Sequence, residues 1–435
     1  MQSLDRDERL FELNPRMLLV PASVAKLAAV ATAVDAVGWD FRFETTLRAT
    51  GPIVDGVLQG DLLVVGSGDP TIGGRAGDDI TSWIDGLKAA GIRRINGRIV
   101  GDDDAIEEPR PQLAWAWDDL GYTTGALFGA LNLAENRLTV TITPGPAAGT
   151  AAAVSLEPHA LRPLANRVAT VAPGTTQFVW PEQRPGEPFL TIAGTVVAGA
   201  QPVRLNVSAG NPTLWFAAVL RNRLQRAGIE VVGDAWDIDD VLPRPDRTAA
   251  TVLWTHRSRP LAEIVQPLLK DSINLYAEAV MRLNAAAGAL PTNDAALEGF
   301  RRRLESWGIP ADAQQVIDGS GLSRRDVISA EAVLAILQRM QDRSLASAYV
   351  TALPIAGVDG SLENRMRNTP AAGNVRAKTG TMSNIRSLAG YVTTRDGERL
   401  AFVAMVNNFE GPGASANQAL DAIAVRLASF SRNGS

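Results

Sequence analysis

Apolar residues recur at three- and four-residue intervals near both ends of the chain. Between residues 23 and 37, Ala, Val and Leu follow this spacing, with Pro21 just before the segment and Gly38 just after it. The pattern predicts a helix over 23–37. The same spacing predicts four further helices after residue 258, at about 260–286, 293–307, 330–345 and 414–431.

The middle of the chain has a different pattern. From about residue 95 to 255, short β-branched and apolar runs are interrupted by Gly and Pro, which is typical of strands and turns. One helix, 212–227, is predicted inside this region. Strands are also predicted at 41–50, 56–65, 385–394 and 399–408. The last two form a predicted hairpin around the turn RDGE, and the Gly- and Pro-rich segments 143–153 and 239–250 are predicted joints between domains or subdomains.

This order of elements indicates one α/β domain whose sequence is interrupted by a β-rich insertion. The chain has 435 residues, which corresponds to about three domains of ordinary size. Hydrophobic residues make up 46% of the chain, so it can build ordinary cores and is too apolar to be disordered.

The composition excludes several classes of function. The chain has no Cys, which excludes a Cys nucleophile and a Cys-ligated metal. It has only two His, His159 and His256, far apart in the sequence, so we expect no multi-His metal site. His256 is expected to serve the structure and His159 to lie on the surface. The net charge of -5 argues against nucleic-acid binding.

The sequence is compatible with two cellular locations. No apolar run is long enough to span a bilayer. The segment 16–34 has features of a signal peptide, but acidic residues precede it and Lys26 interrupts it, so an ordinary helix is the better interpretation. The protein is therefore expected to be cytoplasmic or to have lost an export signal before this chain begins.

Ser23 and Lys26 form an S-x-x-K pair at the start of the first predicted helix. Spacing of three residues places both side chains on one helical face. A serine hydroxyl needs a base to become a nucleophile, and a lysine can be that base when burial and a neighbouring cation lower its pKa. Only four of the 42 basic residues are Lys, which makes a retained Lys notable. The structural alternative is a helix cap with a surface Lys.

Two further motifs carry polar groups. Lys378, Thr379, Gly380 and Thr381 precede the predicted hairpin, where they could bind a carboxylate and let a substrate backbone approach closely. The alternative is an exposed turn. Ser272 and Asn274 form an S-x-N pair inside an apolar helical region, a place where polar side chains need a polar role. That pair recurs at 415–417 and 431–433, so it is uninformative by itself.

The ordered set S-x-x-K, S-x-N, K-T-G is the signature of penicillin-recognising serine enzymes. Ile273 departs from the Asp that the second motif usually carries. The chain resembles class C low-molecular-mass penicillin-binding proteins, the D-alanyl-D-alanine carboxypeptidase/endopeptidase family, through several more segments: LNPRMLLVPASVAKL, LQGDLLVVGSGDPTI, WAWDDLGY, LNLAENRLTVTITPG, HRSRPLAEIV, DGSGLSRRDVIS, LPIAGVDGSLENRM and RAKTGTM.

The resemblance implies a multi-domain α/β fold. A discontinuous penicillin-recognising domain of the β-lactamase/transpeptidase type, 1–41 with 256–435, would carry two inserted β-rich domains, 42–67 with 155–255 and 68–154. The long gap between Ser23 and Ser272 fits these insertions, because β-lactamases of similar motif order have a much shorter gap. The family acts on peptidoglycan in the periplasm or cell wall, so the resemblance implies an exported protein.

The resemblance also implies roles for the motif residues. Ser23 would be the nucleophile and Lys26 its base, with Lys378 helping to keep Lys26 neutral. Ser272 would relay a proton to the leaving amine, supported by Asn274. The oxyanion would lie between the backbone N–H groups of Ser23 and Thr381. The expected substrate-binding residues are Thr379, Gly380, Thr381, Met382, Asp118 and Tyr122.

Asp118 and Tyr122 belong to an acidic and aromatic cluster that also includes Trp115, Trp117 and Asp119. Asp118 could pair with the free amine of a peptidoglycan diamino acid, and Met382 could line the same pocket. The alternative is that the cluster packs the inserted domain.

The expected function is a serine carboxypeptidase/endopeptidase that acts on peptidoglycan stem peptides through an acyl-serine, with β-lactams as covalent inhibitors and no metal or cofactor. One alternative is a β-lactamase or esterase, and another is a catalytically idle wall-binding scaffold. Peripheral membrane association and oligomeric state stay open. The glycines of 66–74 do not fit a dinucleotide loop, and Asp318 before GSG does not fit a G-x-S-x-G elbow.

Overall fold

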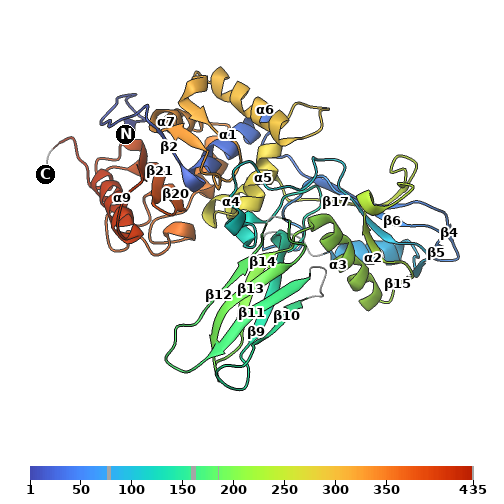
Figure 1. Ribbon diagram of the computed structural model, residues 1–435. Helices are drawn as coiled ribbons and strands as arrows, with labels where there is room; N and C mark the ends of the chain where they lie inside the picture. Colours follow the sequence, from blue (N-terminus) through green and yellow to red (C-terminus); the bar gives the residue numbers. More distant parts are fainter. Residues whose placement is uncertain (76–79, 158–162, 185, 434–435) are drawn as a thin grey trace. The chain divides into compact units, whose positions relative to one another are not determined.

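The structure is a computed structural model that describes residues 1–75, 80–157, 163–184 and 186–433 (Figure 1). It divides into two compact units. The first comprises Met1–Arg42, Gln112–Ala114 and Arg259–Ser435, and the second comprises Phe43–Pro111 and Trp115–Ser258. An α/β unit interrupted by a long insertion is the organisation that the sequence pattern predicted.

The first unit contains a four-stranded antiparallel sheet in the order β1-β22-β21-β20. Its strands are β1 (Gln2–Ser3), β20 (Arg376–Met382), β21 (Ile385–Thr393) and β22 (Arg399–Asn407). The predicted hairpin is confirmed, with Ile385 opposite Asn407 and Thr393 opposite Arg399. Helix α9 (Gly413–Ala428) packs on β21 and helix α7 (Ala330–Arg339) packs on β22, which covers the sheet with apolar side chains.

Helix α1 (Ala25–Val37) is the central helix of the first unit. It packs against α4, α5, α6 and α7, and all its residues from Ala25 to Val34 are buried. A helix that is apolar on every side suits this place. Lys26 is the only charged side chain in that buried stretch. The helix predicted over 23–37 is confirmed, although its first turn, η1 (Ala22–Val24), is a 3₁₀-helix, and Gly38 ends it with a positive φ of 79°.

The helix predicted over 260–286 is wrong as one element. The chain forms α4 (Leu261–Lys270) and α5 (Asn274–Arg282), separated by a break in which Ser272 has a φ of 62°. Apolar spacing continues across the break, because both helices bury one face, so periodicity alone did not reveal it. A left-handed non-glycine residue is strained, and such strain often accompanies a functional site.

The other predicted helices of the first unit are present with shifted ends. Helix α6 (Asn293–Ser306) matches its prediction, whereas α7 ends at Arg339, several residues early. A further helix, α8 (Ala346–Ala352), was not predicted. A small sheet and two single turns complete the unit: β2 (Leu18–Leu19), β18 (Gln314–Gln315), β19 (Val327–Ser329), η6 (Ala311–Ala313) and η7 (Gly360–Leu362).

The second unit is built mainly from strands, as predicted. Its mixed five-stranded sheet has the order β16-β8-β6-β3-β17, and its four-stranded sheet has the order β15-β7-β5-β4. These strands are β3 (Glu44–Ala49), β4 (Ile53–Val54), β5 (Val57–Leu58), β6 (Leu62–Val65), β7 (Arg94–Ile95), β8 (Ile99–Asp102), β15 (Glu230–Val231), β16 (Ala235–Asp237) and β17 (Thr251–Arg257). The strand predicted over 56–65 is therefore two short strands.

Two three-stranded sheets, β10-β9-β14 and β11-β13-β12, form the rest of the second unit (Figure 1). Their strands are β9 (Arg137–Thr143), β10 (Ala153–Glu157), β11 (Leu164–Val171), β12 (Phe178–Glu182), β13 (Leu190–Val197) and β14 (Val203–Ser208). The helices of this unit are α2 (Thr81–Ala89) and α3 (Pro212–Arg226), and only the second was predicted. Short 3₁₀ turns lie at η2 (Trp117–Asp119), η3 (Thr123–Gly125), η4 (Ala134–Asn136) and η5 (Ile238–Asp240).

Each of the two segments predicted as a joint between domains connects two strands of the same sheet. Segment 143–153 connects β9 to β10, which are neighbours in one sheet, and segment 239–250 connects two strands of the five-stranded sheet. The division of the insertion at residues 68 and 154 stays a prediction, and β9, β10 and β14 form one sheet across the second of these boundaries.

His256 has the structural place that we expected. It is 7% exposed, its Nε2 lies 3.4 Å from Asp69 Oδ2, and its ring lies 5.1 Å from the ring of Trp83. His159 lies outside the described residues. Across the part of the chain that the structure describes, every helix is too short or too polar to cross a membrane.

Candidate active site

The site in the first unit is built around the side-chain nitrogen of Lys26. Its Nζ lies 2.9 Å from Ser23 Oγ, 2.7 Å from Asn274 Oδ1 and 2.6 Å from the carbonyl oxygen of Ser320. The S-x-x-K spacing puts Ser23 and Lys26 on one face, where the 3₁₀ turn leads into α1. The predicted pair is therefore in direct contact, and the alternative of a surface lysine is wrong because Lys26 has 0% exposure.

Burial lowers the pKa of Lys26 to about 7, although the nearby carboxyl groups of Asp318, Glu278 and Asp326 act to raise it. Two of the three contacts of Nζ are carbonyl-type oxygens, which can only accept hydrogen bonds. A neutral lysine has two N–H donors for these two oxygens and one lone pair left for the Ser23 hydroxyl. The arrangement therefore suits an amine that takes a proton from Ser23.

The break between α4 and α5 brings the S-x-N motif to the same place. Asn274 is the first residue of α5, and its side-chain oxygen accepts the hydrogen bond from Lys26. Ser272 Oγ accepts a hydrogen bond of 2.9 Å from Lys378 Nζ. On a continuous helix two side chains at this spacing would point to nearly opposite sides, so the break is what lets both reach the same site.

Strand β20 carries the K-T-G motif along the edge of the sheet. Lys378 is fully buried, and its pKa is lowered well below the ordinary lysine value, first by burial and then by the charge of Lys26. A Cβ added at Gly380 would lie 2.4 Å from the carbonyl oxygen of Pro21, so only glycine lets β20 approach the turn that holds Ser23. The role of Gly380 in substrate approach stays a prediction, and in the structure the same position also makes room for the backbone of Pro21.

The two threonines of β20 share one face, because side chains alternate along a strand. Thr379 is 7% exposed and its hydroxyl donates a 2.7 Å hydrogen bond to Ser361 Oγ. Thr381 is exposed, and Met382 is partly exposed at the end of the strand. Sequence reasoning missed Ser361, which stands in the segment LPIAGVDGSLENRM of the family resemblance.

Three buried carboxyl groups next to Lys26 were also missed. Glu278 lies on α5, and Asp318 and Asp326 lie between β18 and β19. All three side chains have 0% exposure. One signal was available for Glu278, which is an acid at an apolar position four residues after Asn274. No comparable signal marks Asp318 and Asp326, whose contacts depend on segments distant in sequence.

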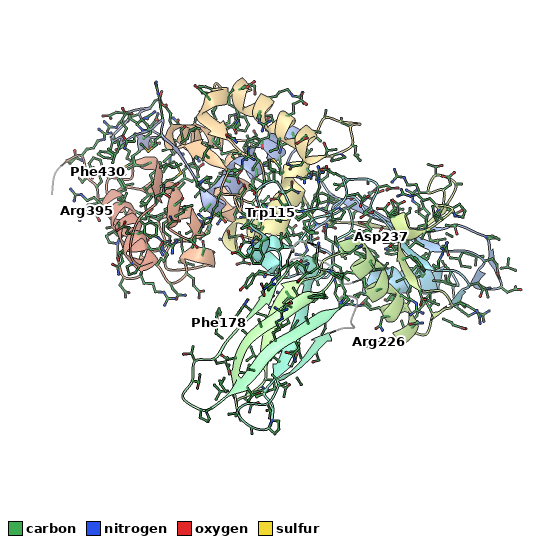
Figure 2. All side chains as sticks on the ribbon, in the orientation of Figure 1. Trp115, Phe178, Arg226, Asp237, Arg395 and Phe430 are labelled. Atoms are coloured by element: carbon green, nitrogen blue, oxygen red, sulfur yellow. The ribbon has the colours of Figure 1, made fainter. Side chains whose placement is uncertain are left out.

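Asp118 and Tyr122 belong to the second unit. Asp118 is exposed in η2 and Tyr122 is 36% exposed, while Trp115 (labelled in Figure 2) is only 8% exposed. Burial raises the pKa of Tyr122, and the charges of Asp118 and Asp119 raise it further, so these groups are near one another. Their part in the Ser23 site stays a prediction.

One group of carboxylates in the described residues could hold a cation, Asp103, Asp104 and Glu108, whose ligand oxygens lie within 4.8 Å of one another. This group lies in the second unit, and Arg244 already forms an ion pair with Asp104 there.

Comparison with known proteins gives a consistent result. The family model described as "D-Ala-D-Ala carboxypeptidase 3 (S13) family" matches residues 1–429. The D-alanyl-D-alanine carboxypeptidase of Actinomadura sp. (strain R39) is 33% identical over 437 residues, which cover 97% of this chain and 79% of that protein. DacB of Haemophilus influenzae is 25% identical over 420 residues, 94% of this chain and 84% of that protein.

A solved structure establishes the fold. The crystal structure of penicillin binding protein 4 (dacB) from Haemophilus influenzae matches with a TM-score of 0.86 and 24% identity, covering 99% of this chain and 95% of that chain. The predicted family and enzyme class, a serine-type D-Ala-D-Ala carboxypeptidase, are thereby confirmed. The chain belongs to the D-Ala-D-Ala carboxypeptidase 3 (S13) family.

Proposed function

We propose that this carboxypeptidase cleaves the D-Ala-D-Ala bond of peptidoglycan stem peptides with Ser23 as nucleophile and Lys26 as its base. One observation carries this assignment: Lys26 is fully buried, contacts Ser23 Oγ at 2.9 Å, and has a pKa lowered to about 7. A base with a pKa near the working pH transfers protons most effectively.

In the first step, Ser23 Oγ attacks the carbonyl carbon of the scissile amide while its proton passes to Lys26 Nζ. Ser23 lies in the first turn of a helix, where backbone N–H groups have no partner within the helix, and β20 is the edge strand of its sheet. The backbone N–H groups of Ser23 and Thr381 are therefore proposed to bind the developing oxyanion.

The C–N bond then breaks and the departing D-Ala amine needs a proton. Ser272, which contacts Lys378 at 2.9 Å, is the proposed donor. The proton that Lys26 took from Ser23 then restores the Ser272 hydroxyl, so that neither lysine has gained or lost a proton when acylation is complete. Asn274 keeps Lys26 in place through its side-chain oxygen. Water then attacks the ester on Ser23, which releases the shortened peptide and regenerates the hydroxyl.

Substrate recognition is proposed to use side chains of β20 and of the acidic and aromatic cluster in the second unit. Thr379 and Thr381 lie on one face of β20 and would bind the terminal carboxylate, with Met382 beside them. Asp118 and Tyr122 would bind the diamino acid of the stem peptide, with the carboxylate of Asp118 paired with the free amine of that residue. Because peptidoglycan lies outside the cytoplasmic membrane, the proposed location is the periplasm or cell wall.

β-Lactams are the proposed covalent inhibitors, because their strained amide would acylate Ser23 in place of the substrate. The related Haemophilus influenzae structure has been solved as a complex with a β-lactam. Intact-protein mass after incubation with benzylpenicillin tests the assignment. We expect one stable adduct, mapped to Ser23, and none in the Ser23→Ala variant. Release of D-Ala from a stem peptide by Ser23→Ala would contradict the proposal.

A further inference from the structure

Three carboxyl groups are buried beside Lys26 without a part in the proton transfers proposed above. Glu278, Asp318 and Asp326 have 0% exposure, and each of the three acts to raise the pKa of Lys26 when it is ionised. Buried acids are costly unless they are paired and hydrogen-bonded. Their partners therefore indicate what these acids do.

Asp318 shapes the turn that faces Lys26. Its Oδ1 accepts hydrogen bonds from the backbone N–H groups of Ser320, at 3.0 Å, and Gly321, at 2.6 Å. Its Oδ2 accepts one of 2.8 Å from the N–H of Ser323. Both oxygens are thus used to fold the turn from residue 319 to residue 323. The carbonyl of Ser320 then points to Lys26 Nζ at 2.6 Å.

Glu278 fixes the same turn from helix α5. Its Oε1 accepts hydrogen bonds from the N–H groups of Gly319, at 3.1 Å, and Ser320, at 3.0 Å. Glu278 lies four residues after Asn274, so both side chains project from one face of α5. That face therefore makes one contact with Lys26 directly, through Asn274, and another indirectly, through the Ser320 carbonyl.

The turn also touches the segment that holds the nucleophile. A Cβ added at Gly321, whose φ is 74°, would lie 2.0 Å from the carbonyl oxygen of Ala22. Ala22 directly precedes Ser23. Any shift of the turn would therefore move the serine as well as the lysine.

We propose that Glu278 and Asp318 are positioning residues for Lys26, which together hold the turn that presents the Ser320 carbonyl to its Nζ and keep two acidic groups beside it. This inference rests on the proposed role of Lys26 as the base. In this arrangement the acids oppose the effect of burial, so that Lys26 stays basic enough to accept a proton.

Among the described residues, four titratable groups are close to Lys26. Glu278 faces it from α5, Asp318 and Asp326 face it from the segment between β18 and β19, and Lys378 faces it from β20. Arg282, one turn along α5, lies 3.9 Å from Glu278 Oε2. Burial and Asp318 raise the pKa of Asp326, which favours its neutral form as a hydrogen-bond donor to Asp318.

Charge and geometry can be separated by two substitutions. Glu278→Gln keeps the oxygen that accepts from Gly319 and Ser320 but removes the charge. Burial and the charge of Asp318 raise the pKa of Glu278 to about 7, so in the wild type Glu278 ionises over the same pH range in which Lys26 loses its proton. We expect Glu278→Gln to move the rise of the acylation rate with pH about half a unit lower and to make it steeper, because no ionising carboxylate then holds the proton on Lys26, and we expect the plateau rate to fall about threefold because the base is weaker. Glu278→Asp, which restores the charge, should return the rise to its original pH.

Asp318→Asn replaces an accepting oxygen by an NH₂ group, so the turn cannot keep all its hydrogen bonds. We expect acylation by benzylpenicillin to fall at least about tenfold at every pH. Exposed Glu305→Gln on α6 is the matched charge control and should leave the rate and its pH profile unchanged. Thermal unfolding checks that each variant is folded.

A wild-type pH profile in folded Glu278→Gln, or a wild-type rate in folded Asp318→Asn, would overturn the positioning role. Lys26→Arg keeps the two possible failures distinct. If Lys26→Arg were acylated at the wild-type rate, the proposed role of Lys26 itself would fail. If Lys26→Arg is inactive and the acidic variants behave as wild type, only the inference fails.

Discussion

Lys26 is buried more completely than a lysine normally is, and this burial makes it chemically useful. Transfer of an ammonium group out of water disfavours its charged form, so the amine is neutral at a pH where an exposed lysine would be charged. The surrounding structure holds this unfavourable group with three well-placed oxygens. The buried lysine lowers the stability of the fold and makes the site reactive, a trade-off that is common at functional sites.

The pKa of Lys26 predicts the pH dependence of acylation. Only the neutral amine accepts the Ser23 proton, so the rate should rise about tenfold per pH unit below 7 and level off above it. Stopped-flow acylation with a chromogenic cephalosporin between pH 5 and 9 measures this. Lys26→Arg should be inactive throughout, because arginine keeps its proton. A flat wild-type profile between pH 5 and 8 would contradict the prediction.

The left-handed backbone of Ser272 predicts a difference between two substitutions. Both Ser272→Gly and Ser272→Ala remove the hydroxyl that accepts from Lys378, so both should lose most of the acylation rate. Only glycine relieves the strain of a φ of 62°. We expect Ser272→Gly to be more stable than Ser272→Ala by about 1 kcal/mol, measured by thermal unfolding. Equal stabilities would mean that this backbone is not strained.

The sequence alone predicted the motif residues that now lie together: Ser23, Lys26, Ser272, Asn274 and Lys378. Ser23 and Lys26 could be placed because a helix turn fixes their spacing, and the remaining three through the order of the motifs. Glu278 and Asp318 could not, because their hydrogen bonds join a helix to a distant turn and no local period records that contact.

At the scale of elements, the site depends on close approach between a strand, a turn and a helix start. Apolar spacing predicted most helices of the first unit and the hairpin. It did not predict the break at Ser272, because α4 and α5 both keep an apolar face toward the core. A helix break that places polar active-site residues leaves the spacing of apolar residues unchanged, so that spacing does not reveal it.

Gly380 tests the approach of β20 to the nucleophile. In Gly380→Ala the new methyl would meet the carbonyl of Pro21 at 2.4 Å, so β20 and the turn carrying Ser23 must separate. We expect acylation to fall about 100-fold, since displacements near 1 Å have that effect. Gly397→Ala, at an open turn between β21 and β22, is the control and should cost about 1 kcal/mol of stability without this loss.

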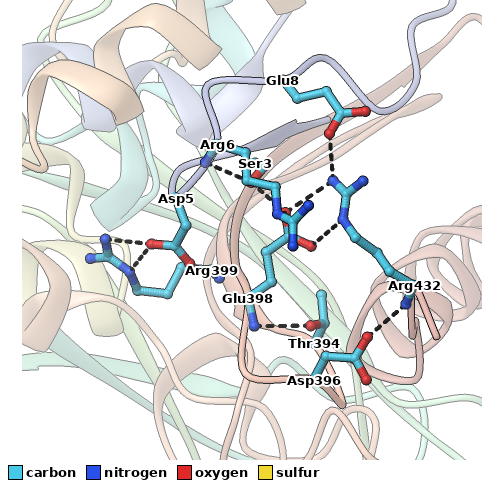
Figure 3. Close-up of polar contacts among 9 residues, drawn as sticks. All are labelled: Ser3, Asp5, Arg6, Glu8, Thr394, Asp396, Glu398, Arg399 and Arg432. Carbon is cyan, nitrogen blue, oxygen red and sulfur yellow. Dashed lines mark hydrogen bonds and ion pairs between the residues drawn. The ribbon is translucent and has the colours of Figure 1, made fainter.

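A polar cluster ties β1 to the far end of the chain (Figure 3). Glu398 accepts hydrogen bonds from Ser3 at 2.5 Å and from Arg432 at 2.8 Å. These contacts lower the pKa of Glu398 to about 2. The carboxylate therefore stabilises the folded chain above about pH 4.5, its ordinary range, and this contribution is lost as the pH falls through 2.

Glu398→Gln should accordingly lower the thermal unfolding midpoint at pH 7, and its difference from the wild type should shrink between pH 4.5 and 2. Glu410→Gln, an exposed acid of the same unit, is the matched control and should leave the midpoint unchanged. A difference that stays constant down to pH 2 would show that the charge of Glu398 does not stabilise this cluster.

At the scale of the whole molecule, the chain leaves the first unit and returns to it at nearly the same point. Phe43 N–H donates to Ser258 Oγ at 2.9 Å, and Ser258 N–H donates to the carbonyl of Phe43 at 3.0 Å. In the first unit, Leu261 N–H donates to the carbonyl of Phe41 at 2.9 Å. The ends of a domain that lie close together make it separable.

This closeness predicts that the first unit folds and reacts without the second. Replacement of residues 43–258 by a short Gly/Ser linker keeps every proposed catalytic side chain and α1 with its core. We expect benzylpenicillin to acylate Ser23 in this variant at a rate within about tenfold of that of the full chain. A moderate fall is expected because Gln112–Ala114, which belongs to the first unit, is lost with the insertion. Adduct mass measures the reaction, and Ser23→Ala in the same variant is its control.

The same variant should lose cleavage of a stem peptide far more than it loses acylation. Acylation by a β-lactam needs Ser23, its base Lys26 and the residues of β20 that would bind the carboxylate. The proposed recognition of the diamino acid needs in addition Asp118 and Tyr122 from the second unit. Asp118→Asn in the full chain should reproduce this separation, with a higher KM for a stem peptide that has a free amine and no change in acylation by benzylpenicillin. An unchanged KM would remove Asp118 from the substrate site and return its cluster to a packing role.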